Sequence, residues 1–171
     1  MPCALRVPPR TVERRAATPY RAGMSSISEG GCACGTVRYA LRSAPFDAGW
    51  CHCRICQRVS GAPAMVFASV PTGDFAFIAG AERVKRFASS EFGHRQFCGD
   101  CGSPLTIAVE FQPVTIDFAI ATLDDPDAVA PGFHIFRASR VAWFETADDL
   151  PRHERFRPRT RGLVGTEPPE S

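Results

Sequence analysis

Seven of the eight cysteines form three short groups whose spacing is typical of metal-binding thiolates. The groups are GGCACG with Cys32 and Cys34, CHCRIC with Cys51, Cys53 and Cys56, and FCGDCG with Cys98 and Cys101. A closed tetrahedral zinc site takes four protein ligands, so seven thiolates divide into one complete set and one set of three with an open position. We therefore expect two zinc ions per chain, one structural and one at which chemistry takes place.

Cys32 and Cys34 are two residues apart, so they face the same side of an extended segment. In FCGDCG, Gly99 and Gly102 allow the turn of a zinc knuckle. Joining the CAC pair to this knuckle gives a Cys₄ site and leaves the three cysteines of CHCRIC for the open site.

The spacing also permits other arrangements of the CRIC pair, Cys53 and Cys56. It could join Cys98 and Cys101 as a zinc ribbon, although the two CxxC pairs are further apart than the usual ~15 to 20 residues. It could also be a redox pair, although such pairs normally start a helix in a βαβ unit, and this chain shows no such pattern. Disulfides are the remaining alternative, but the chain has no export signal, which favours reduced thiols in a cytosol.

Composition indicates one globular domain with unstructured ends. Residues 1–23 carry four prolines and five arginines, so we expect a disordered leader, an over-extended start that makes Met24 an alternative first residue, or an Arg-rich targeting segment. Cys3 lies in this leader and is expected to be a bystander. We place the zinc-binding domain at 24–156 and a disordered tail at 157–171.

Charge and hydropathy exclude two classes of partner. Both ends are basic, but residues 24–151 hold ten basic and fourteen acidic side chains, so a nucleic-acid surface on the domain is not expected. No apolar run approaches the ~20 residues of a membrane span, so we expect no membrane association and a cytoplasmic protein.

The pattern between the ends predicts an all-β, mainly antiparallel fold. Short runs rich in β-branched and aromatic residues alternate with turn residues, and they predict strands at 36–41, 64–70, 74–78, 84–88, 105–109, 114–121 and 133–136. A helical turn is predicted at 54–59, directly after CHC, and a second at 147–150 before Pro151.

Five motifs, in order, resemble the GFA family, named for glutathione-dependent formaldehyde-activating enzyme and related to centromere protein V. They are GGCxCGxVRY, CHCxxCQRxSGAPA, FCxxCGSPL, ATLDDP and HIFxxSRVAWFETADDLP. The resemblance implies a β-tent fold stabilised by zinc, with Cys32, Cys34, Cys98 and Cys101 as structural ligands. It also implies that Cys51, Cys53 and Cys56 hold the catalytic zinc.

By the same resemblance, the chain adds a small thiol, glutathione, to an aldehyde, formaldehyde, as a carbon–sulfur lyase. Three thiolates leave a divalent zinc site with a net charge of −1, which suits thiol activation better than hydrolysis. Two alternatives stay open, a non-enzymatic binding module and a redox sensor based on the thiols or zinc.

Other polar residues are weaker candidates. His52 is a candidate proton shuttle, although its side chain is expected to point away from the cysteines on either side of it. Arg58 is a candidate for binding a carboxylate of a peptide-like thiol. We expect His134 to be a hydrogen-bonded core residue, Asp117 to face water, and Trp143 to cover the core.

Overall fold

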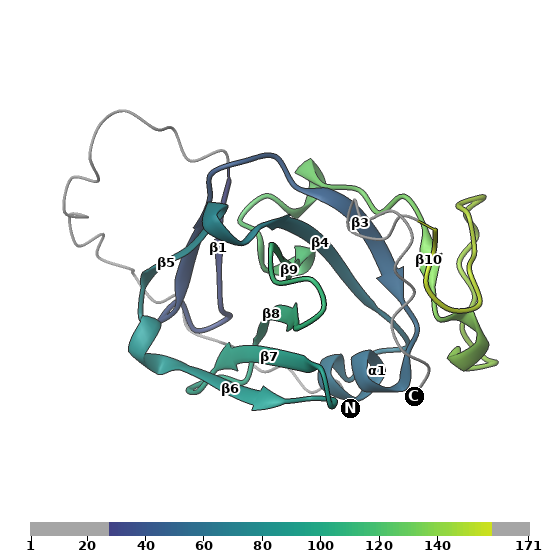
Figure 1. Cartoon of the computed structure of the whole chain (residues 1–171), viewed down its shortest axis with the longest axis horizontal. Coiled ribbons are helices and arrows are strands. Elements are labelled where there is room, and N and C mark those ends of the chain that lie inside the picture. The colour runs from purple at the N-terminus through teal and green to yellow at the C-terminus, as the bar shows by residue number, and fades with distance from the viewer. Residues whose placement is uncertain (1–27, 159–171) are drawn as a thin grey trace, which may run out of the picture.

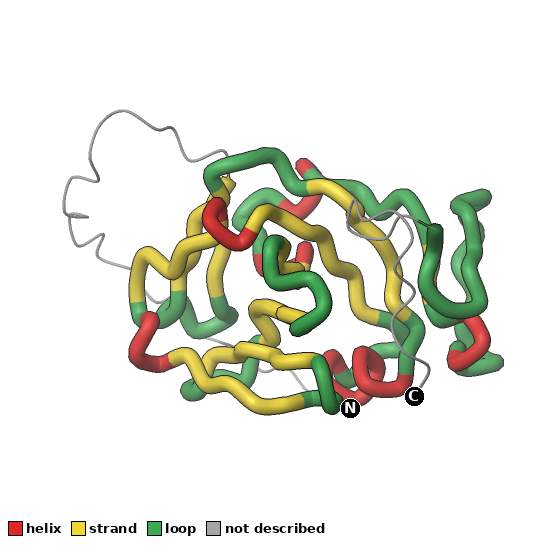
Figure 2. The backbone as a smooth tube through the Cα atoms, in the orientation of Figure 1, coloured by secondary structure: helices red, strands yellow, loops and turns green. Residues whose placement is uncertain are grey.

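The computed structural model describes residues 28–158, which form two β-sheets and one short α-helix (Figures 1 and 2). The strands are β1 (Ser28–Gly31), β2 (Arg38–Leu41), β3 (Phe46–Cys51), β4 (Met65–Pro71), β5 (Phe75–Ala79), β6 (Val84–Ala88), β7 (Gly93–Cys98), β8 (Pro104–Val109), β9 (Thr115–Ala119) and β10 (His134–Ile135). The helix is α1 (Arg54–Ser60), and five 3₁₀ turns connect strands elsewhere in this part of the chain. The predicted leader, Cys3 and nearly all of the predicted tail lie outside the described residues.

The small sheet has the strand order β1-β2-β5, and the large sheet has the order β10-β3-β4-β9-β8-β7-β6. All of these pairs are antiparallel except β10 with β3. In Figure 1 the large sheet curves from β10 through β4 to β6, and the small sheet stands at the side opposite β10. The all-β, mainly antiparallel prediction is confirmed.

Period-two alternation gives the large sheet two buried faces. One face packs against the small sheet, where the ring of Tyr39 on β2 lies 6.1 Å from that of Phe118 on β9. The other face carries a second apolar cluster, which includes Met65 and Phe67 of β4 together with Phe133. Three of the cysteines belong to or pack against this second cluster, so their surroundings are apolar.

The predicted strands correspond to β2, β4, β5, β6, β8, β9 and β10, whereas β1, β3 and β7 were not predicted. The sequences SEGG, FDAGWC and GHRQFC contain glycine or charged residues, which hide strand propensity. These three segments become strands because each forms hydrogen bonds with a neighbouring strand.

Three further predictions were wrong. Residues 147–150 form no helical turn, because the Asp148 carboxylate accepts the Leu150 backbone N–H and so stabilises an irregular segment. Asp117 is only 1% exposed, and the Ser69 hydroxyl donates a hydrogen bond to it at 2.7 Å. Trp143 is 76% exposed and packs at its edge against Phe144 rather than covering the core.

Candidate metal centres

The structure brings the seven cysteines together as two separate clusters. The sulfur atoms within each cluster lie within 4.8 Å of one another. The first cluster consists of Cys32, Cys34, Cys98 and Cys101, and the second consists of Cys51, Cys53 and Cys56. The zinc-ribbon arrangement is therefore not the one adopted. All seven are free thiols rather than disulfides.

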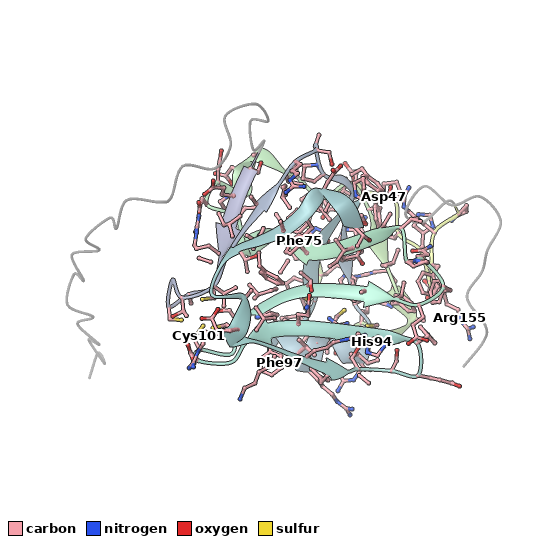
Figure 3. The ribbon with its side chains drawn as sticks, turned by 60° about the vertical axis from the view of Figure 1, so that its left-hand side comes forward. Asp47, Phe75, His94, Phe97, Cys101 and Arg155 are labelled. Atoms are coloured by element: carbon pink, nitrogen blue, oxygen red, sulfur yellow. The ribbon has the colours of Figure 1, made fainter. Side chains whose placement is uncertain are left out.

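The four-cysteine cluster joins the segment after β1 to the turn between β7 and β8. Figure 3 shows Cys101 at this end of the β7–β8 hairpin and His94 towards the other end. The Ala33 backbone N–H donates to the Ser103 hydroxyl at 3.0 Å, which ties the two loops together. Gly102, with a φ of 76°, makes the turn that a side-chain-bearing residue would strain.

Backbone and hydroxyl groups surround the sulfurs of the four-cysteine cluster. The Val37 N–H donates to the Cys32 sulfur at 3.2 Å. The Ser103 hydroxyl, 3.2 Å from the Cys101 sulfur, lowers the pKa of that thiol to about 6. Neutral donors of this kind favour thiolates, so the donor set fits a fully thiolate-bound zinc ion.

The three-cysteine cluster lies where β3 meets α1. Cys51 ends β3, and Cys53 is the N-cap of α1, where its sulfur accepts the Cys56 N–H at 3.3 Å. The buried Gln57 side chain donates to the backbone carbonyl of His52 at 2.6 Å and to that of Ser139 at 3.0 Å. The helix therefore holds Cys53 and Cys56 in a fixed relation to the end of β3.

The pKa values of the thiols in the three-cysteine cluster are shifted in opposite directions. Hydrogen bonds from Cys51 and Cys56 lower the pKa of Cys53 to about 2, and the bond to Cys53 raises the pKa of Cys51 well above its ordinary value. Because the cluster already stabilises one thiolate and has three sulfurs within reach of one centre, its donor set fits a soft divalent ion.

Arg95 is a site residue that the sequence did not reveal. Its Nη2 donates to the Cys56 sulfur at 3.2 Å, and its side chain is 6% exposed. Nothing in the segment GHRQFC distinguishes this arginine, and β7 was not predicted as a strand. The contact arises because antiparallel pairing places Arg95 opposite Ile107, on the face of the large sheet that carries the cysteines.

His52 points to a different partner from its neighbouring cysteines. Its Nε2 lies 2.9 Å from Nδ1 of His134, and the Nε2 of His134 lies 3.1 Å from the Asp148 carboxylate. Since Asp148 accepts a proton-bearing Nε2, the His134 Nδ1 accepts from His52. His134 is thus a hydrogen-bonded core residue, as expected.

The His52 ring is completely buried, and its Nδ1 has no partner among residues 28–158. Burial, reinforced by the charge of Arg137, lowers the pKa of His52 to about 4, so the ring is neutral at pH 7. Arg58, the other weak candidate, lies in the last turn of α1 and is exposed.

Comparison with known proteins identifies the class to which this fold and these clusters belong. The sequence profile of the GFA family, described as glutathione-dependent formaldehyde-activating enzyme, matches residues 27–139. The chain belongs to this family, and its two-sheet fold is the family's β-tent. At family level, the names of its relatives describe enzymes of the lyase kind.

Two curated relatives are similar over parts of the chain. A Halomonas elongata protein carrying the name glutathione-dependent formaldehyde-activating enzyme is 27% identical over 126 residues, 70% of this chain and 80% of the relative. An uncharacterized lyase of Schizosaccharomyces pombe is 30% identical over 80 residues, 47% of this chain and 56% of the relative.

A solved structure supports the fold alone. The crystal structure of a Rhodobacter sphaeroides protein matches with a TM-score of 0.50 at 24% sequence identity. The match covers 60% of this chain and 91% of the other. Within the described residues, no helix has the length and hydropathy needed to cross a membrane.

Proposed function

We propose that this protein is a zinc-dependent carbon–sulfur lyase that joins a small thiol to an aldehyde and catalyses the reverse cleavage. The observation that carries the proposal is the incomplete cluster of Cys51, Cys53 and Cys56, which is separate from a complete cluster of four. Glutathione and formaldehyde are the proposed substrates, because the matched family and the Halomonas elongata relative are named for them.

In this proposal the four-cysteine cluster holds a structural zinc and the three-cysteine cluster holds a catalytic zinc. When bound by three thiolates, zinc supplies a fourth position at which a thiol is activated as a thiolate at neutral pH. The thiol sulfur forms a bond to the aldehyde carbon, the carbonyl π bond breaks, and the aldehyde oxygen takes up the proton that the thiol has lost. The product with formaldehyde is an S-(hydroxymethyl) thioether.

The chain's own residues prepare this site in three ways. Gln57 anchors α1 so that two sulfurs stay in register with Cys51. Met65, Phe67 and other apolar side chains of the second cluster exclude water. Free thiols throughout the described clusters are consistent with a reducing compartment, so we propose a cytoplasmic location.

An exchange measurement tests the reaction directly. NMR exchange spectroscopy with ¹³C-formaldehyde and glutathione is expected to show faster adduct formation and breakdown with the zinc-loaded protein than in buffer. Cys53→Ser is expected to return exchange to the buffer rate, whereas Cys3→Ser, the same change at a cysteine outside the three cysteine motifs of the sequence, is expected to keep full activity. Equal rates with wild type and buffer would contradict the proposal and favour a binding module.

A further inference from the structure

The Arg95 guanidinium is a buried cation that lacks the usual kind of partner. Its Nη2 donates to the Cys56 sulfur at 3.2 Å, and its Nη1 lies 3.8 Å from the Met65 sulfur. Within residues 28–158 it forms no ion pair with a carboxylate, and its buried Nε has no hydrogen-bond partner. Arginine stays protonated in proteins, so this charge is permanent.

A buried charge without an opposite charge is strongly destabilising. The anions available to Arg95 among residues 28–158 are the sulfurs of the three-cysteine cluster, because its Nη2 donates a hydrogen bond to Cys56. Arg137, the other arginine that is buried among residues 28–158, differs in this respect. It pairs with the Glu145 carboxylate at 2.6 Å.

The Arg95 guanidinium offsets the negative charge of the three-cysteine cluster when an ion and a fourth ligand are bound. Three thiolates and a divalent ion sum to −1, and a fourth, anionic ligand brings the sum to −2. In the four-cysteine cluster, two sulfurs are exposed, so water screens the same total. In the three-cysteine cluster, Cys51 and Cys56 are buried, so a fourth anion needs a nearby positive charge, and Arg95 supplies it.

We propose that Arg95 is a positioning and specificity residue that makes the three-cysteine centre accept an anionic fourth ligand, a thiolate, in preference to a neutral one. This inference rests on the proposed function, in which that ligand is the substrate thiol. The competing use of Arg95 is to bind a carboxylate of glutathione, which its unpartnered Nε–H and planar fork also suit. The two uses predict different responses to thiols that lack carboxylates.

The test measures ligand binding to the full chain loaded with Co²⁺, whose visible and sulfur-to-cobalt charge-transfer bands report the fourth ligand. Glutathione, 2-mercaptoethanol and neutral imidazole are titrated into wild type, Arg95→Gln and Arg95→Lys. Arg83→Gln is the matched control, because Arg83 pairs with the Asp100 carboxylate beside the other cluster. The four-cysteine cobalt bands in each sample report whether the variant is folded.

We expect Arg95→Gln to lower the affinity for both thiols by about tenfold to a hundredfold, the range for losing a charge-assisted hydrogen bond. Imidazole binding is expected to change less than about threefold, and Arg95→Lys, which keeps the charge, is expected to retain most of the preference for thiols. Arg83→Gln is expected to match wild type.

Three results would overturn the inference. If Arg95→Gln lowers the affinities for thiols and for imidazole equally, Arg95 is a structural residue. If the affinities do not change, the charge of Arg95 has no effect on the choice of ligand. Weakening with glutathione but not with 2-mercaptoethanol would assign Arg95 to carboxylate recognition instead. Failure of the proposed function gives a different result, because wild type itself would then bind neither thiol.

Discussion

The two cysteine clusters of this protein use the same ligand type in opposite surroundings. The four-cysteine cluster has two exposed cysteines and is formed by loops and the end of β7, with neutral backbone and hydroxyl donors. The three-cysteine cluster lies on an apolar face, is fixed by a strand end and a capped helix, and has a buried arginine. The comparison teaches that one ligand type occupies two settings here, and in our proposal the set of four near water stabilises the fold while the set of three beside a buried cation supports the chemistry.

Strand β7 contributes to both clusters. Cys98 at its end belongs to the four-cysteine cluster, while Arg95, three residues earlier, contacts the three-cysteine cluster. A change that loosens the four-cysteine cluster is therefore expected to disturb the three-cysteine cluster, but the reverse is not expected. This asymmetry can be tested by breaking each cluster separately.

The largest expected effect is that of Cys98→Ser, which removes a completely buried sulfur of the four-cysteine cluster. Structural zinc contributes on the order of 10 kcal/mol to folding in small zinc modules, so this variant is expected to be unfolded at 25 °C. Circular dichroism and the loss of a cooperative melting transition would show it. A folded variant with a wild-type melting temperature would contradict a structural function for this cluster.

The matching change in the other cluster is Cys51→Ser, which is also at a buried sulfur. We expect the melting temperature to fall by only a few degrees, because the strand and helix that carry the cluster remain packed, whereas adduct exchange drops to the buffer rate. Calorimetry and the exchange assay on one preparation check both parts. Unfolding comparable to that of Cys98→Ser would erase the difference between the clusters.

A third prediction concerns the histidine pair behind the three-cysteine cluster. His134→Ala removes the partner of His52 and of Asp148 and leaves a cavity, so we expect the free energy of unfolding to fall by about 2 to 4 kcal/mol. Chemical denaturation measures this loss, and zinc at the four-cysteine cluster is expected to remain. Loss of zinc from the four-cysteine cluster in His134→Ala would show that the histidine pair and this cluster are energetically coupled.

The smallest expected effect lies at the surface near the four-cysteine cluster, where Arg38 pairs with Asp124. The hydrogen bond from Arg38 lowers the pKa of Asp124. A lowered pKa in the folded state means that the contribution is present above the ordinary value of 3.8 and is lost as pH falls through the folded value.

Because both side chains are partly exposed, Asp124→Asn is expected to cost less than about 1 kcal/mol at pH 7 and nothing at low pH. Denaturation curves at pH 7 and pH 3, with and without 1 M salt, measure the difference. A cost at pH 3 that equals the cost at pH 7, and that 1 M salt does not reduce, would show that charge is not the cause.

Much of this arrangement could be predicted from the sequence, because cysteine spacing is a local signal. CxC and CxxC place sulfurs on one side of a short segment, so residues 32–101 favoured the four-plus-three division. The spacing left the zinc-ribbon pairing open, and the structure shows the four-plus-three grouping. Short runs rich in β-branched and aromatic residues likewise predicted β4 and β8, whose side chains fill the buried faces.

What could not be predicted depends on contacts between distant segments. Arg95 meets Cys56 across 39 residues because of strand register, and His52 meets His134 across 82 residues because β10 pairs with β3. Asp117 alternates like a surface residue, yet Ser69 on the adjacent strand satisfies it in the interior. Local propensity carries no information about such partners.

The central claim, one closed and one open zinc centre, is tested most directly by zinc content per chain. Elemental analysis before and after mild chelation, with and without glutathione, is expected to give two zinc ions, of which one is removed by the chelator and retained when glutathione is present. A single tightly bound zinc ion that is unaffected by glutathione would contradict the account.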